Sequence, residues 1–266
     1  MAPASAVQLH EEADPARIER LSSRLRDEGV LRNPALVAVL PDGDYVVLDG
    51  ANRTSALIML GAAVIPVQVV DYSDPGVALD VWSHFLLNAG GLPSRLQAKG
   101  FSIRALPQTA ELVPERGVRT CFVATGNDIY EVDLGPQPAG ALAGIVGTYK
   151  GTTRIYRVPG LDPGEGIHEQ LHRLAREYGA DGTLIDFPML TKADILTIAR
   201  DPVKLPTGIT RHLIAGRALR LNVPLEVLTA PGAVDEKQAW LAEYVQQKLL
   251  DNRVRYYPEA TVLFDE

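Results

Sequence analysis

The sequence predicts an α+β protein of two domains, and three observations lead to this prediction. Residues 45–72 have the pattern of a strand, a tight turn, a helix and a second strand. Residues 120–132 have the pattern of two short strands joined by a turn, and amphipathic helices follow them. Between these regions, 105–117 is polar and contains two prolines, which is typical of a linker. We therefore expect domains at 1–104 and 118–266.

Local signals place the elements of each half. Asp14 followed by Pro15 is a good helix N-cap and first helical residue, and Gly29 marks the end of that helix. Residues 34–40 and 45–48 predict a hairpin across a Pro-Asp-Gly-Asp turn. Further strands are expected at 7–9, 64–70, 153–158 and 255–264, and further helices at 52–60, 92–100, 141–150, 166–178, 191–199 and 235–252.

Composition excludes several classes of protein. The chain has 266 residues and is 46% hydrophobic, which allows one large core or two modest ones. Its formal net charge of −7 disfavours general nucleic-acid binding. Its single cysteine, Cys121, rules out a disulfide framework within the chain. No signal peptide and no apolar run of about 20 residues is visible, so we expect a cytoplasmic protein with no membrane contact.

The turn at 49–54, Asp-Gly-Ala-Asn-Arg-Thr, combines features of an anion site. It leads into a helix N-terminus, where backbone N–H groups favour negative charge. Gly50 allows the backbone to approach a ligand closely. Asp49, at the end of the strand, could hold a metal ion or a reacting hydroxyl. A simpler interpretation is that Asp49 caps the helix and Arg53 pairs with a surface charge.

A second informative stretch covers residues 206–228. It contains Thr210 and Arg211, and a hydroxyl beside a guanidinium fork suits a carboxylate ligand. The simpler interpretation is a solvated strand end, with Arg217 and Arg220 as further surface charge.

Four blocks of this sequence carry a resemblance to a known family. DGANRTSALIMLGAAVIPVQV resembles the DGxHRxxALxxLGxxxIPV signature of the ParB/sulfiredoxin-like fold. Within that superfamily the chain most resembles the free L-serine kinases, including those that serve siderophore pathways. LHEEADPARIERLSSRLRDEGVLRNPALV, VWSHF and PTGITRHLIAGRALRLNVPLEVL resemble further blocks of that family. The resemblance covers almost the whole chain and is weaker between about 98 and 190.

The resemblance implies a fold and an activity. We expect a ParB/sulfiredoxin-like, nucleotide-binding N-terminal domain and a C-terminal α+β domain that completes the substrate site, with the active site in the cleft between them. The family transfers a phosphoryl group from a nucleotide to the hydroxyl of free L-serine with Mg²⁺, which gives O-phospho-L-serine. The sequence leaves open whether ATP or ADP is the donor.

The resemblance also implies roles for individual residues. Glu11 in the LHE block would be the general base, and its neighbour Glu12 would not. Asp49 would either orient the serine hydroxyl or hold Mg²⁺. The nucleotide phosphates would be bound by Gly50, Ala51, Asn52, Arg53 and Thr54, the serine pocket would be walled by Trp82 and His84, and the serine carboxylate would be held by Thr210, Arg211 and His212.

This chain departs from the family signature at Asn52, where the family has histidine. Asparagine can donate a hydrogen bond to a phosphate oxygen but cannot carry a proton at neutral pH. Core packing is an alternative for Trp82, and a surface position is an alternative for His84. The His168–His172 pair has the spacing of two metal ligands on a helix but lacks a third, so we interpret it as surface.

Two other functions remain possible at this point. The first is a kinase for another small amino acid. The second is a ParB-like nucleotide-binding regulatory protein without kinase activity. The acidic net charge and the absence of a helix-turn-helix pattern after the first domain argue against the ParB-like regulatory protein.

Overall fold

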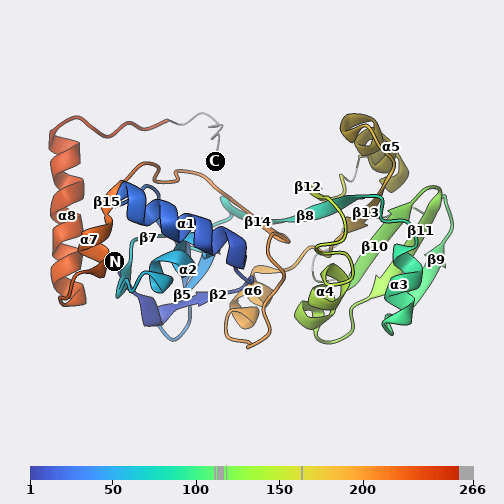
Figure 1. Cartoon of the computed structure of the whole chain (residues 1–266), viewed down its shortest axis with the longest axis horizontal. Coiled ribbons are helices and arrows are strands. Elements are labelled where there is room, and N and C mark those ends of the chain that lie inside the picture. The colour runs from blue at the N-terminus through green and yellow to red at the C-terminus, as the bar shows by residue number, and fades with distance from the viewer. Residues whose placement is uncertain (111, 113–116, 118, 163, 258–266) are drawn as a thin grey trace. The chain divides into compact units, whose positions relative to one another are not determined.

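The chain folds into two compact units (Figure 1). The computed structural model describes residues 1–110, 112, 117, 119–162 and 164–257. Unit 1 consists of Met1–Leu9, Ala13–Val77 and Ile214–Glu266, and unit 2 of His10–Glu12 and Ala78–Leu213. The predicted α+β class is confirmed, because both units combine sheets with helices.

The units do not follow the predicted division into two consecutive halves. The chain leaves unit 1 after Val77 and returns to it at Ile214, whereas the predicted linker covers 105–117. The reason lies in β-pairing, because the long strand β8 (Val77–Leu87) hydrogen-bonds with later strands of unit 2. Part of the predicted linker also pairs as a strand, and 111, 113–116 lie outside the described residues.

Unit 1 is built on a mixed four-stranded sheet in the order β2-β5-β4-β7. Its outer pairs are parallel and the central hairpin is antiparallel, as predicted for 34–48. The elements of this unit are β1 (Ala2–Pro3), the 3-10 helix η1 (Ala4–Ala6), β2 (Val7–Leu9), α1 (Pro15–Glu28), β3 (Val30–Leu31), β4 (Ala35–Val39), β5 (Tyr45–Asp49), α2 (Ala51–Met59), β6 (Val64–Ile65), β7 (Val67–Val69), β15 (Val223–Pro224), α7 (Leu225–Thr229) and α8 (Val234–Leu250).

The helix α1 begins and ends where the sequence predicts. The Asp14 side chain accepts a hydrogen bond from the Arg17 N–H at 3.0 Å, and Gly29 is the C-cap. Leu25 is buried in the core of unit 1. Helices α1 and α2 pack side by side (Figure 1).

Unit 2 is built on a larger sheet in the order β12-β8-β13-β10-β11-β9, with β14 also paired to β8. The neighbours along this path are antiparallel. The elements of this unit are β8, α3 (Leu92–Ala98), β9 (Ile103–Leu106), β10 (Thr120–Thr125), β11 (Asp128–Asp133), α4 (Pro138–Val146), β12 (Ile155–Pro159), α5 (Ile167–Tyr178), β13 (Gly182–Asp186), α6 (Lys192–Ile198) and β14 (Thr210–Ile214).

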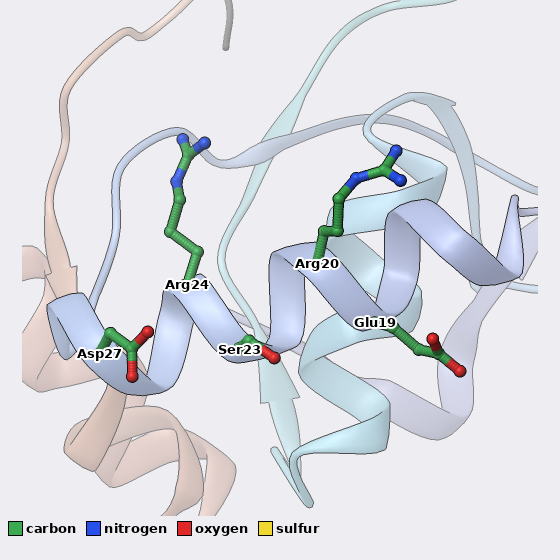
Figure 2. Close-up of a pocket in the computed structure, with 5 residues that line it drawn as sticks. All are labelled: Glu19, Arg20, Ser23, Arg24 and Asp27. Atoms are coloured by element: carbon green, nitrogen blue, oxygen red, sulfur yellow. The ribbon is translucent and has the colours of Figure 1, made fainter.

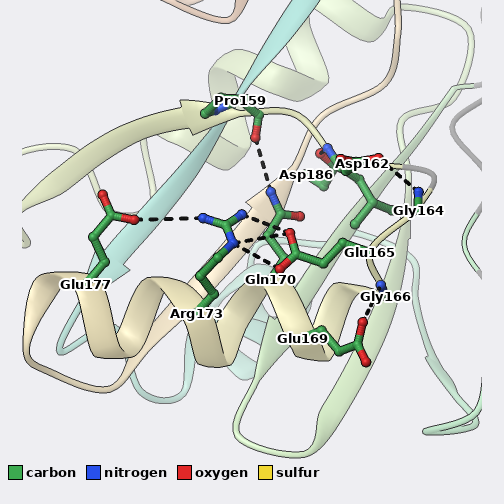
Figure 3. A network of polar contacts seen from close by, with 11 residues as sticks. Pro159, Asp162, Gly164, Glu165, Gly166, Glu169, Gln170, Arg173, Glu177 and Asp186 are labelled. Carbon is green, nitrogen blue, oxygen red and sulfur yellow. Dashed lines mark hydrogen bonds and ion pairs between the residues drawn. The ribbon is translucent and has the colours of Figure 1, made fainter.

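A polar network holds the loop before α5 against that helix (Figure 3). Arg173 forms a bidentate ion pair with Glu165, in which both N–O distances are 2.9 Å. These hydrogen bonds lower the pKa of Glu165. At the other end of the loop, the buried carboxylate of Asp186 accepts hydrogen bonds from Ser83 and from the Leu161 N–H. The loop is therefore fixed by side chains rather than by strand pairing.

Three sequence predictions differ from the structure, and one strand has no counterpart among the predictions. Pro66 divides the strand expected at 64–70 into β6 and β7, because proline has no N–H to donate to a ladder. The helix expected at 141–150 is α4, which starts three residues earlier with Pro138 in its first turn. Strand β13 was not predicted. Residues 255–257 are not a strand, and 258–264 of the expected final strand lie outside the described residues.

Within the described ranges, every helix is too short or too polar to cross a bilayer.

Packing between β13 and β8 leaves no space for a side chain at Gly182. A Cβ atom there would lie 2.5 Å from the ring of Phe85, which is fully buried, and 2.7 Å from the Leu86 carbonyl oxygen. We predict that Gly182→Ala lowers the free energy of unfolding by about 1–3 kcal/mol through overpacking. Gly90→Ala, where a Cβ meets nothing within 4 Å, should not lower it. Urea denaturation followed by circular dichroism checks both, and equal stabilities would contradict the packing argument.

Candidate functional site

Glu11 is the centre of a hydrogen-bond cluster in unit 2. Its Oε1 accepts from the backbone N–H groups of Ile209 at 3.1 Å and Thr210 at 2.7 Å, and from the Thr210 hydroxyl at 2.6 Å. Its Oε2 accepts from the Gly208 N–H at 2.8 Å. The main chain around Glu11 also pairs with Leu205, which fixes the approach of the two segments. The structure thus brings Glu11 together with the 208–210 segment.

The side chains of His10 and Thr210 extend this cluster. The Thr210 hydroxyl has one proton, which it donates to the Glu11 carboxylate, so it accepts from His10 Nε2 at 2.8 Å. His10 therefore carries a proton on Nε2. The ring of His212 packs edge-on against His10, with centroids 5.5 Å apart. His10 was not predicted as a site residue, although it directly precedes Glu11 in the LHE block.

Gly208 is favoured by its backbone geometry, and the end of the Arg157 side chain occupies the space where a Cβ would lie. Its φ of +80° lies in the left-handed region, and a Cβ would lie 2.2 Å from the guanidinium carbon of Arg157 on β12. Arg157 donates to the Thr207 carbonyl at 3.1 Å. Arg157 therefore packs on the turn that presents its N–H groups to Glu11, a contact that local sequence patterns do not reveal.

Arg211 lies on the face of Trp82. Its guanidinium carbon is 4.6 Å from the ring centroid, which is cation–π geometry. Its Nη1 is 3.6 Å from Asp80 Oδ2, so charge attraction rather than a hydrogen bond holds this pair. Trp82 is half-buried on β8, and it is not a core residue. The structure thus places Trp82 and Arg211 side by side on adjacent strands.

His84 is buried, contrary to the surface alternative. Only 2% of it is exposed, its Nδ1 is 2.7 Å from the Tyr149 hydroxyl, and its ring packs edge-on against Phe187. Burial, together with the positive charge of Arg157, lowers the pKa of His84 to about 4, and the hydrogen bond with the Gly208 backbone opposes this shift. The imidazole is therefore neutral at pH 7.

Two arginines meet at Asp49 in unit 1. Arg53 Nη2 and Arg217 Nη1 each lie 3.0 Å from Asp49 Oδ2. The helix cap is Gly50, without a side-chain capping bond, so Asp49 does not cap α2. Arg53 does pair with a carboxylate, as the simpler interpretation held, but its partner is Asp49 itself. The sequence pattern indicates only a surface charge at Arg217, although this residue belongs to the GRxLxL part of the block at 206–228.

The remaining residues of the turn are arranged around the N-terminus of α2. Gly50 has a φ of +103°, and a Cβ there would lie 3.0 Å from Arg53 Nη2. Asn52 Oδ1 accepts from the Asp14 N–H at 2.8 Å, so its NH₂ group is the end left to donate. Ala51 is the first helical residue. The Thr54 hydroxyl is buried and has no hydrogen-bond partner among the described residues.

No ready-made metal cage is present in the described part of the chain, where three or more His, Cys, Asp or Glu side chains do not come together. A shallow hollow of another kind lies on the outer face of α1, lined by Glu19, Arg20, Ser23, Arg24 and Asp27 (Figure 2). All five come from one helix, and none is a predicted site residue. We therefore do not assign a function to this hollow.

Several solved structures share this fold, including the following two. SbnI with a C-terminal truncation, from Staphylococcus aureus, has a TM-score of 0.74 at 23% sequence identity, covering 93% of this chain and 95% of that chain. A free serine kinase in complex with AMP has a TM-score of 0.70 at 20% identity, covering 85% and 91%. The class of fold is therefore the one found in free serine kinase structures.

The relatives found by sequence are named as L-serine kinases. The chain is 26% identical to the ATP-dependent L-serine kinase SbnI of Staphylococcus aureus over 100% of its own length and 96% of the relative. It is 26% identical to the ATP-dependent L-serine kinase of Staphylothermus marinus (82% and 86% covered) and 24% identical to the ADP-dependent L-serine kinase SerK of Thermococcus kodakarensis (82% and 88%). No family model matches the chain. The resemblance to the free L-serine kinases is confirmed.

We predict that His84 titrates far below the ordinary pKa of a histidine side chain. The chain has five histidines, and the imidazole proton NMR signal of His84, assigned with His84→Gln, should have a midpoint near 4. Because the unfolded chain binds this proton near its ordinary pKa of about 6.5, His84 makes folding less favourable as pH falls from about 6.5 to 4. A midpoint above 6 would contradict the buried, neutral assignment.

Proposed function

We propose that this protein is a nucleotide-dependent free L-serine kinase that forms O-phospho-L-serine. The observation that carries the proposal is the match over the whole chain to a relative named as an L-serine kinase. The clusters around Glu11 and Asp49 support it, because phosphoryl transfer needs a base for the acceptor hydroxyl and positive charge for the phosphates.

On the acceptor side, we assign the proton of the serine hydroxyl to one oxygen atom of Glu11. Glu11 Oε1 accepts three hydrogen bonds, whereas Oε2 accepts one and keeps an unused lone pair. Oε2 would take the serine hydroxyl proton as the hydroxyl oxygen attacks phosphorus. The bond from phosphorus to the nucleotide's bridging oxygen then breaks, and the shortened nucleotide leaves.

The serine itself would be bound by residues of the same unit. Arg211, with its fork held flat on Trp82, would bind the serine carboxylate together with His212. Thr210 donates its hydroxyl proton to Glu11, so its role would be to orient the base. Neutral His84 would border the serine pocket without adding charge.

On the donor side, the turn at 49–54 would bind the nucleotide phosphates. The N–H groups of Ala51 and its neighbours at the start of α2, the amide of Asn52 and the guanidinium of Arg53 are suitable donors. The Thr54 hydroxyl, buried without a partner, would gain one from a ligand or water.

Mg²⁺ fits this donor set. It is commonly bound by one or two carboxylates together with water and substrate phosphates, so a complete protein cage is unnecessary. Asp49 would hold it through Oδ1, since Oδ2 receives both arginines. When bound, Mg²⁺ neutralises charge on the transferred phosphoryl group. Asp49 could instead orient the serine hydroxyl.

The substrate is tested directly. We predict that the purified protein with Mg²⁺ and either ATP or ADP converts L-serine to O-phospho-L-serine, detected by mass spectrometry, and that EDTA abolishes turnover. Running both nucleotides identifies the donor. Turnover only with threonine or homoserine would change the substrate, and specific DNA retention without turnover would favour a regulatory protein.

The base is tested by Glu11→Gln. We predict a loss of about 10²- to 10⁴-fold in kcat, the usual value of general base catalysis, with little change in nucleotide affinity. In this variant an NH₂ group would also face a backbone N–H group, so folding is checked by circular dichroism at the assay temperature.

Glu12→Gln is the matched control. Glu12 is exposed and contacts Leu205 and Thr207 through its backbone, which the substitution preserves. Its kcat should stay close to the original value. If both variants keep near-original kcat, Glu11 is not the base, and Asp49 becomes the next candidate.

A further inference from the structure

The segment that carries Arg217 has no regular structure of its own. Residues 215–222, all of which the structure describes, form neither helix nor strand, and 216–220 are exposed. Yet Arg217 reaches Asp49 with an N–O distance of 3.0 Å. Something other than strand or helix hydrogen bonds must therefore fix the backbone at this position.

The side-chain amide of Gln68 holds the backbone on both sides of Arg217. Gln68 lies on β7, and its Nε2 donates to the Gly216 carbonyl at 2.9 Å. Its Oε1 accepts from the Ala218 N–H at 2.7 Å. The two bonds flank Arg217 on either side, as a neighbouring strand would do. Only a side chain with both a donor and an acceptor at its end can make this pair.

Two further contacts hold the segment beyond Arg217. The Arg220 N–H donates to Asn33 Oδ1 at 2.8 Å, and the Asn222 N–H donates to the Arg32 carbonyl at 3.1 Å. These contacts lie three and five positions after Arg217. Gln68 is thus the contact that sets the arginine's own backbone.

The side chain of Arg217 lies beside other groups that donate hydrogen bonds. Arg53 and Arg217 both approach one oxygen of Asp49. The N-terminus of α2, a helix of nine residues, adds partial positive charge beside them. Each guanidinium group has several N–H donors, and two such groups side by side suit an anion with more than one oxygen, such as a di- or triphosphate.

We propose that Arg217 is a second phosphate-binding arginine of the nucleotide site, and that Gln68 is a positioning residue that holds Arg217 in place for it. This inference rests on the proposed function, since the nucleotide site at 49–54 is part of that proposal. Gln68 acts through Arg217 and does not itself touch the phosphates.

A double-mutant cycle tests the inference. Arg217→Ala should weaken ATP or ADP binding, measured by isothermal titration calorimetry, by about 10- to 100-fold, as expected for a lost charge-assisted hydrogen bond. Gln68→Ala should weaken it in the same direction, while the KM for serine stays unchanged. The double variant should bind no more weakly than Arg217→Ala, because Gln68 acts only through Arg217.

Gln68→Glu and Gln247→Ala provide the matched comparisons. Glu has the same shape but two acceptor oxygens, so it loses the bond to the Gly216 carbonyl, and nucleotide affinity should fall as with Gln68→Ala. Gln247 donates to Asp251 on exposed α8, and Gln247→Ala should leave nucleotide affinity unchanged. Circular dichroism checks that each variant is folded, and the exposed Arg217 can be truncated without disturbing a core.

The outcomes separate this inference from the proposed function. Phosphoserine formation with unchanged nucleotide affinity in Arg217→Ala would overturn the inference and leave the kinase intact. Additive losses in the double variant would overturn the positioning role of Gln68. Arg217-dependent nucleotide binding without serine turnover would support the inference while the kinase proposal fails. No nucleotide binding by the original protein would overturn both.

Discussion

The hydrogen bonds between the carboxylate of Glu11 and the backbone N–H groups of 208–210 are the interaction around which the rest of the candidate site in unit 2 is arranged. It joins segments separated by 199 positions in sequence at Thr210. Gly208 in this turn has a left-handed φ, and the guanidinium of Arg157 packs where a Cβ would lie. With the turn fixed, β14 pairs with β8, and Arg211 lies on Trp82. A single carboxylate thereby organises the residues proposed to bind serine, and the same group is the proposed base.

In unit 1, two arginines, Arg53 and Arg217, are held close together at Asp49. Like charges repel, and the cost is reduced here because Asp49 lies between them and the three side chains are only partly buried. A rigid strand carries Asp49, a helix carries Arg53, and a side-chain amide holds the segment of Arg217, so each charge is positioned by a different kind of local structure.

Local sequence signals succeeded where the physical cause is local. Asp14, Pro15 and Gly29 gave the limits of α1, because capping depends on residues within one helical turn. The hairpin of β4 and β5 followed from its turn residues in the same way. Strand β13 was missed, because its five residues are fixed by pairing with β8 and β10, which lie far away in sequence. The compact units differ from the predicted division for the same reason, since β8 pairs with strands that follow much later.

The sequence by itself determined the α+β class, most element limits and the family resemblance, because these are written in neighbouring residues and in motif blocks. The sequence predicted Glu11, Asp49 and Arg211 as site residues, but it did not predict which residues each one contacts. Only the tertiary structure decided that Thr210 donates to Glu11, that His84 is buried beside Tyr149, and that Arg217 joins Arg53 at Asp49. These contacts depend on how segments that are far apart in the sequence pack together. Such packing does not produce a periodic or local sequence pattern from which it could be predicted.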